Sequence, residues 1–218
     1  MKHLEILARK LARQRFLEND RPPPNEPDEA VEVSESGYIL INKFLKTIFF
    51  CGPINNAGLA EFLRGISIID SYEEQNKSIK AFPKTLFISS RGGDLGASFA
   101  IYDQVVFHKF NTCAMGEVFS GAATIFLGGK ARFMMPNSFL VFHDTRYSVH
   151  TDDYGLEESD VDNQQLKEFM RRHIRIITSA SRNKINNEEA QRLILGRKII
   201  WPELAIKYGL AHNILKKR

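Results

Sequence analysis

The chain has 218 residues, of which 43% are hydrophobic, and its 30 basic and 26 acidic residues leave a net charge of +4. This length is sufficient for one well-buried domain. No apolar stretch approaches the length of a membrane span, and Cys51 and Cys113 lie in apolar runs without metal-ligand spacing. We therefore expect a cytoplasmic protein of a reducing compartment, with no membrane, metal or cofactor requirement.

The first 37 residues differ in composition from the rest of the chain. A basic, partly apolar start is followed by acidic residues and by the prolines of Pro22 to Pro27, which cannot continue a helix. The basic start is compatible with a short amphipathic helix, either a docking element or an ordinary solvated terminus. We expect residues 1–37 to form an N-terminal segment with a linker or loop, and residues 38–218 to form the ordered domain.

From residue 38 onward, strand-like runs alternate with segments of helical periodicity. Apolar residues recur at helical spacing between Leu59 and Ile66 and between Leu95 and Val106. Such alternation is typical of an α/β layer fold. The strands that we expect are residues 47–51, 85–89, 112–115, 131–135 and 139–143.

Three segments of this core carry residues suited to chemistry. One strand runs into Gly92 and Gly93, where backbone N–H groups can approach a substrate closely. Ser120 lies between a strand-like run and the apolar, helix-compatible residues 122–127, a turn at which N–H groups can hold an oxyanion. His143 ends an apolar strand and is a suitable general base for a serine. The simpler interpretation of Ser120 is a helix cap.

After His143 comes a stretch rich in acidic residues, followed by a long amphipathic helix. Its apolar stripe predicts one buried face, against the same chain or a neighbour. His173 lies on this stripe, and we interpret it as a packed structural residue. Arg171, Arg172 and Arg175, beside so much acid and without interleaved aromatic residues, indicate a solvated face and no nucleic-acid binding. The stripe comprises Leu166, Phe169, Met170, His173, Ile174 and Ile177.

Together the three turns resemble those of the proteolytic subunit of the Clp protease family. In that family the glycine turn reads Asn-Ser-Pro-Gly-Gly, the nucleophile turn reads Gly-Gln-Ala-Ala-Ser-Met-Gly-Ala, and the base follows Pro-Asn-Ser on a strand. This chain has Ser-Ser-Arg-Gly-Gly, Gly-Glu-Val-Phe-Ser-Gly-Ala-Ala and Pro-Asn-Ser-Phe-Leu-Val-Phe-His in the same order. The resemblance extends from about Tyr38 to Leu215.

The resemblance implies a crotonase-like α/β fold of repeated β-β-α units that form a head domain, with a helical handle projecting at about residues 144–180. It implies that Ser120 is the nucleophile, that His143 is the base, and that Gly93 and Gly121 supply the oxyanion N–H groups. It also implies that the Pro-rich segment forms a loop around an axial pore.

The third member of the family's triad does not appear at its position. The family carries an aspartate fifteen residues before its Tyr-Gly-Leu motif, and this chain has Leu193 there. Glu189 is a candidate because it would share a helical face with Leu193. Asn187 or a backbone carbonyl are alternatives, whereas Asp144 is less suitable because neighbouring strand residues point to opposite faces. Loss of the orienting carboxylate lowers turnover by about four orders of magnitude in other serine proteases.

The resemblance implies a serine endopeptidase subunit that cleaves peptides or unfolded proteins inside an oligomeric chamber. Its partners would be identical or paralogous subunits in single or double heptameric rings, and a separate AAA+ unfoldase. Two alternatives stay open: a catalytically weak or inactive subunit of a mixed barrel, which Leu193 suggests, and a crotonase-type enzyme acting on acyl thioesters. The retained pair of Ser120 and His143 favours the peptidase.

Overall fold

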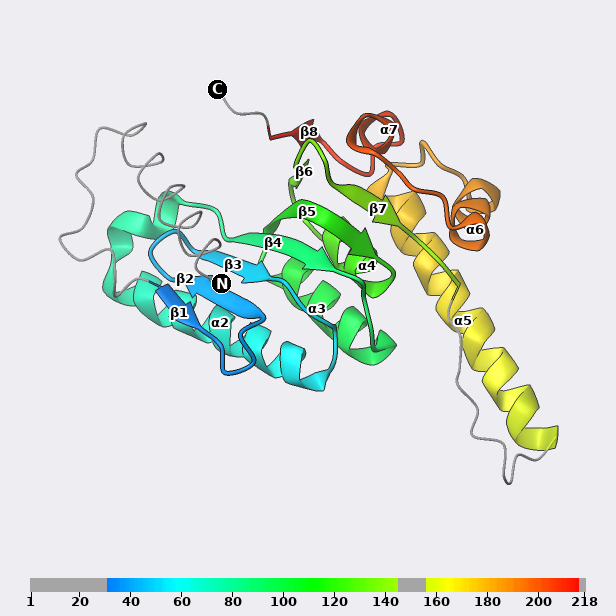
Figure 1. Ribbon diagram of the computed structural model, residues 1–218, viewed down its shortest axis with the longest axis horizontal. Coiled ribbons are helices and arrows are strands. Elements are labelled where there is room, and N and C mark those ends of the chain that lie inside the picture. Colours follow the sequence, from blue (N-terminus) through cyan, green and yellow to red (C-terminus); the bar gives the residue numbers. More distant parts are fainter. Residues whose placement is uncertain (1–30, 145–155, 216–218) are drawn as a thin grey trace.

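The computed structural model describes residues 31–144 and 156–215 (Figure 1). The basic start of the chain, its Pro-rich linker and the first part of the acidic stretch lie outside the described residues. The strands are β1 (Val31–Val33), β2 (Ile39–Asn42), β3 (Thr47–Phe50), β4 (Thr85–Ser90), β5 (Asn111–Phe119), β6 (Arg132–Met134), β7 (Phe139–Val141) and β8 (Asn213–Ile214). The helices are α2 (Asn56–Gln75), the 3-10 helix η1 (Lys77–Ala81), α3 (Leu95–Phe107), α4 (Gly121–Leu127), α5 (Leu156–Ala180), α6 (Asn187–Gly196) and α7 (Pro202–Lys207).

The strands form one sheet in the order β1-β2-β3-β4-β5-β6-β8. The first three strands pair antiparallel, and the pairs from β3 to β8 are parallel because helices connect successive strands. The α/β class expected from the sequence is confirmed. The sheet begins with β1, at Val31, before residue 38, where we expected the ordered core to begin.

The long strand β5 is the element that positions the site. Its first half pairs with β6, and its second half pairs with β7, so that Phe119 lies opposite Val141. We expected this strand to end at Met115, but it continues through an irregularity at Gly116, whose φ of 61° suits glycine. The extension carries the chain to Ser120 at the same edge of the sheet as the end of β7.

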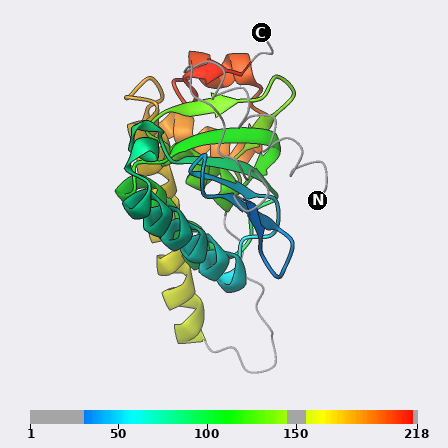
Figure 2. The same cartoon turned by 90° about the vertical axis from the view of Figure 1, so that its left-hand side faces the viewer.

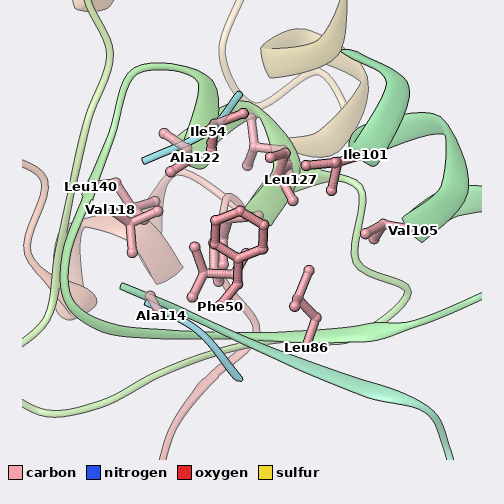
Figure 3. Packing of buried hydrophobic residues seen from close by; sticks show 14 of the residues in the cluster. Phe50, Ile54, Leu86, Ile101, Val105, Ala114, Val118, Ala122, Leu127 and Leu140 are labelled. Atoms are coloured by element: carbon pink, nitrogen blue, oxygen red, sulfur yellow. The ribbon is translucent and has the colours of Figure 1, made fainter. Parts of the chain in front are cut away.

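Side chains of the strands alternate between two faces of the sheet. One face packs under α2, α3 and α4, where Phe50, Leu86 and Ala114 meet Ile101 and Leu127 (Figure 3). The other face holds a smaller cluster of Leu40, Phe49, Phe87 and Cys113, in which the rings of Phe49 and Phe87 stack with centroids 4.7 Å apart. Both faces are apolar, which explains the near-continuous apolar runs of β3 and β4.

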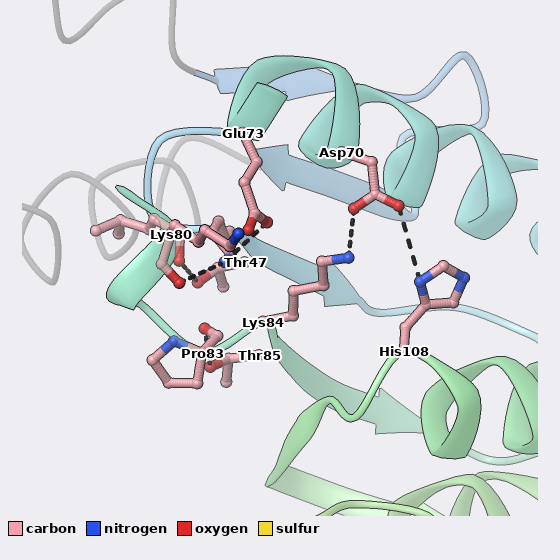
Figure 4. A network of polar contacts seen from close by, with 10 residues as sticks. Thr47, Asp70, Glu73, Lys80, Pro83, Lys84, Thr85 and His108 are labelled. Atoms are coloured by element: carbon pink, nitrogen blue, oxygen red, sulfur yellow. Dashed lines mark hydrogen bonds and ion pairs between the residues drawn. The ribbon is translucent and has the colours of Figure 1, made fainter. Parts of the chain in front are cut away.

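A polar network fastens α2 to the neighbouring ends of β4 and α3 (Figure 4). The Lys84 ammonium pairs with the Asp70 carboxylate, whose second oxygen lies 3.8 Å from Nδ1 of His108. The Lys46 ammonium, almost fully buried, lies 2.9 Å from the Glu73 carboxylate. Burial of His108, and then the Lys84 charge, lower the pKa of this imidazole. The network therefore holds α2 in place by paired charges at one end of the sheet.

Helix α5 leaves the head of the molecule (Figures 1 and 2). Its C-terminal part packs against α4 and α6, while its N-terminal part extends beyond the sheet. Beyond Asp144, α5 covers the described part of residues 144–180, where we expected a helical handle.

Candidate active site

The glycine turn after β4 lies directly against the turn that carries Ser120. A Cβ atom on Gly92 would stand 2.7 Å from Cβ of Ser120, and Gly92 has a φ of 90°. Gly93 pairs with Ile54 in a short bridge, in which Ile54 N–H donates to Gly92 and Asp94 N–H donates to Ile54. A Cβ atom on Gly93 would meet the Ile54 carbonyl oxygen at 2.0 Å. Only glycine permits the close approach of this turn to Ser120 and to Ile54.

Ser120 occupies a strained turn between β5 and α4. Its φ of 55° and ψ of −125° are unusual for a residue with a side chain and cost about 1–3 kcal/mol. The Ser120 N–H donates to the Val141 carbonyl, and the Ser120 carbonyl accepts from the N–H groups of Ala123 and Thr124. The side chain makes no capping hydrogen bond to α4. Ser120 therefore occupies the N-cap position of α4, but its hydroxyl does not cap the helix.

The two expected oxyanion donors flank Ser120. Gly93 lies in the glycine turn, and Gly121 is the first residue of α4. Within residues 31–144 and 156–215, neither N–H donates to an acceptor. Gly121 packs so closely on α3 that a Cβ atom there would stand 2.0 Å from Oγ of Ser98. Close packing therefore holds both glycines in place, Gly93 against the Ile54 backbone and Gly121 against the Ser98 side chain, as electrostatic stabilisation of an oxyanion requires.

His143 follows β7 and faces the same pocket as Ser120. Its Nδ1 lies 2.6 Å from the carbonyl oxygen of Asp144. Because a carbonyl only accepts hydrogen bonds, Nδ1 carries the proton in this arrangement, and Nε2 is left as the basic atom. Nε2 makes no hydrogen bond to any described residue, the Ser120 hydroxyl included.

A pocket of about 350 Å³ brings these residues together. Two of its lining residues, His173 and Arg197, were not expected there. Burial, and then the His143 charge, lower the pKa of His173 to about 4, so this imidazole is neutral at physiological pH. The described lining residues include no carboxylate. They are Gly93, Leu95, Phe119, Ser120, Gly121, His143, His173 and Arg197.

The α6 residues considered for the third position lie outside the pocket, and the Asp144 carboxylate is paired with Arg197. Leu193 is 8% exposed and packs in the main core. The Glu189 carboxylate accepts from the Asn186 N–H, and Asn186 caps α6 in return. Arg197, at the other end of α6, is the residue that reaches the pocket, about 12 Å along the helix axis from Glu189. Asn187, the first residue of α6, shares the distant end with Glu189.

The sequence contained a weak signal for only one of the two unexpected lining residues. His173 packs against Phe99, with ring centroids 5.3 Å apart, as the apolar stripe predicts, but it also borders the pocket. Arg197 has a left-handed conformation with a φ of 47°, a position that glycine usually takes at a helix end. Gly196 lies one residue earlier, so the sequence gives no sign that Arg197 turns the chain.

Other site types find no support among the described residues. No group of histidine, cysteine and acidic side chains there is arranged to hold a metal ion. Within the same residues, no helix combines the length and apolarity needed to cross a membrane.

A serine at a strand-to-helix turn, a histidine just after the adjacent strand and two N–H groups without an acceptor among the described residues give this α/β protein the arrangement of a serine-hydrolase site. The family model described as Clp protease matches residues 33–218, and the chain belongs to this family. ATP-dependent Clp protease proteolytic subunit 2 of Treponema denticola is 28% identical over 82% of this chain and 87% of its own. ATP-dependent Clp protease proteolytic subunit 1 of Tropheryma whipplei is 28% identical over 84% of this chain and 88% of its own. ATP-dependent Clp protease proteolytic subunit 1 of Rhodopirellula baltica is 34% identical over 45% of this chain and 42% of its own.

Proposed function

We propose that this chain is a serine endopeptidase subunit that hydrolyses peptide bonds of peptides and unfolded proteins through an acyl-enzyme. The observation that supports this most is the shared pocket of Ser120, His143, Gly93 and Gly121 in a member of the Clp protease family. The relatives are named as proteolytic subunits of an ATP-dependent protease.

In this proposal the Ser120 hydroxyl attacks the carbonyl carbon of the scissile peptide bond. Nε2 of His143 takes the hydroxyl proton, and the N–H groups of Gly93 and Gly121 hold the oxyanion. His143 returns the proton to the leaving amine as the C–N bond breaks. Water then attacks the acyl-enzyme with His143 again as base, which releases the carboxylic acid and restores Ser120.

A hydrogen bond between the Ser120 hydroxyl and Nε2 of His143 has to form before the first step. Ser120 and His143 line one pocket, yet no hydrogen bond joins their side chains. Catalytic hydrogen bonds of free enzymes are often long and tighten when substrate binds. We place this tightening in the bound or assembled state.

The proposed partners are further subunits, identical or paralogous, in a heptameric ring or double ring, and a separate AAA+ unfoldase. Large apolar side chains exposed on the helices support association, because Phe107 on α3 is 76% exposed and Val106 beside it is also exposed. The proposed compartment is the reducing cytoplasm. Cys51 and Cys113 are free thiols, and burial raises the pKa of Cys113 to about 12, which keeps it unreactive.

A second candidate function is that of a weakly active or inactive wall subunit in a mixed barrel. The specific observation in its favour is that the described lining residues of the pocket include no carboxylate beside His143. A crotonase-type activity on acyl thioesters is less well supported, because such chemistry needs the N–H pair but not a serine and histidine in this arrangement.

The deciding experiment measures hydrolysis of a short fluorogenic peptide by the purified protein, with light scattering of the same sample to give its assembly state. Ser120→Ala should abolish the activity and the labelling by a fluorophosphonate probe. Ser179→Ala is the matched control, because Ser179 is exposed on α5 and lies outside the pocket.

Activity that is lost in Ser120→Ala and kept in Ser179→Ala establishes the serine peptidase. A ring that assembles but neither cleaves peptide nor accepts the probe would support the wall-subunit function. Hydrolysis of an acyl thioester that persists in Ser120→Ala would support the crotonase-type alternative.

A further inference from the structure

Among the described residues His143 has no carboxylate partner in the pocket, yet a backbone carbonyl orients its ring. The Asp144 carbonyl accepts from Nδ1 at 2.6 Å. A neutral carbonyl selects the same tautomer as a triad carboxylate, with Nε2 free to act as base. It stabilises the imidazolium less, because a carbonyl carries only a partial charge. The position of the Asp144 backbone therefore matters for the reaction that we propose.

Strand pairing does not fix Asp144. β7 ends at Val141, and within the described residues the Asp144 N–H has no backbone acceptor. The contact that does reach this residue comes from its side chain. The Arg197 guanidinium donates to the Asp144 carboxylate, with Nη2 3.2 Å from Oδ1.

Arg197 is itself held from both sides. On one side α6 is anchored in the core by Leu193 and Ile194. On the other side Ile200 forms a two-way backbone bridge with Leu140 of β7, with N–O distances of 2.9 and 3.0 Å. The segment from Arg197 to Ile200 therefore spans from α6 to the strand that leads to His143. Its left-handed turn at Arg197 aims the guanidinium back at Asp144.

We propose that Arg197 is a positioning residue that holds Asp144 so that its backbone carbonyl orients His143 in place of a triad carboxylate. This inference rests on the proposed peptidase function. The ion pair is half-exposed on both sides, so its contribution to global stability is small. Its effect is on geometry, where a displacement of about 1 Å can cost about 100-fold in rate.

Charges around His143 give the inference a directional test. The charged or titratable groups that face this region are Asp144 itself, Arg197 at the end of α6 and His173 of α5. Lys167 and Arg171 of α5 border the adjoining groove. Removing the Arg197 charge leaves the Asp144 carboxylate unpaired, which favours a protonated imidazole. Removing the Asp144 charge leaves a cation unpaired, which disfavours it. The two variants should thus move the acidic limb of the pH–rate profile in opposite directions.

The experiment compares Arg197→Ala, Arg197→Lys and Asp144→Asn in the full chain. Arg64→Ala is the matched control, because Arg64 and Glu32 form an ion pair of similar length and exposure far from the pocket. We expect Arg197→Ala to lower kcat by about 10- to 100-fold with a small change in KM. Its acidic limb should move to higher pH, and that of Asp144→Asn to lower pH, while Arg197→Lys recovers part of kcat.

The inference would be overturned if Arg197→Ala behaved like Arg64→Ala in kcat and in pH profile. A readout independent of turnover is the tautomer of His143 by ¹⁵N NMR, which should change from a dominant Nδ1–H form to a mixture in Arg197→Ala. If the wild-type chain cleaves no peptide but shows this change, the proposed function fails and the positioning inference stands. If it cleaves peptide and the tautomer is unaffected by Arg197, the inference fails alone.

Discussion

Replacing Gly93 by alanine tests whether the glycine turn holds an oxyanion donor in place. The new Cβ would lie 2.0 Å from the Ile54 carbonyl oxygen, at a φ of 153° that residues with side chains rarely adopt. The backbone strain costs about 1–3 kcal/mol. Separation of the turn from Ile54 would also break two hydrogen bonds, of 3.0 and 2.7 Å, each contributing about 1 kcal/mol.

The sum is a loss of about 3–5 kcal/mol, which for a chain of this size lowers Tm by about 10 °C. Displacement of the Gly93 N–H should also lower kcat by about 100- to 1,000-fold, the usual cost of one oxyanion donor. Thermal unfolding and peptide hydrolysis below the lowered Tm measure the two effects separately.

The matched control is Gly196→Ala, at the last residue of α6, where the new Cβ would meet no atom within 4 Å apart from its chain neighbours and the helix's own backbone. This substitution should leave kcat unchanged and stabilise the fold slightly, because alanine loses less backbone entropy. A Gly93→Ala protein with the Tm and kcat of wild type would refute both the tight packing of the turn and its role in the reaction.

Two further predictions concern α5 and α6. The unfolded chain protonates His173 near pH 6.5 and the folded chain near 4, so stability is unaffected above 6.5 and falls by about 3 kcal/mol as pH drops to 4. His173→Met should remove this part of the pH slope in denaturant unfolding, and an unchanged slope would contradict the assigned burial. Glu189→Ala should lose about 1 kcal/mol through its capping box, with kcat unaltered, whereas a large drop in kcat would make Glu189 the missing triad acid.

Several features of the fold and site are local in the sequence and could be predicted from it. Gly92 and Gly93 follow an apolar strand, Ser120 precedes an apolar helix, and His143 lies two residues after the end of β7, which we expected to continue to residue 143. Each depends on turn chemistry and periodicity within about ten residues. The structure has the α/β class that the sequence predicts, and residues of the three turns line one pocket.

Contacts between segments distant in the sequence set two features that the sequence does not predict, the full length of β5 and the pairing of Arg197 with Asp144. β5 continues past the irregularity at Gly116, because residues beyond it pair with β7. Arg197 and Asp144 are 53 residues apart, and only the packing of α6 and the bridge between Ile200 and Leu140 bring them together.

The sequence alone therefore predicts Ser120 as a serine nucleophile and His143 as its base, since this prediction depends on residue type and local backbone. The tertiary structure decided which group holds His143. That partner is the backbone carbonyl of Asp144. Because every residue has a backbone carbonyl, no pattern of side chains in the sequence predicts this contact. Its role depends on the position of Asp144, which long-range packing sets.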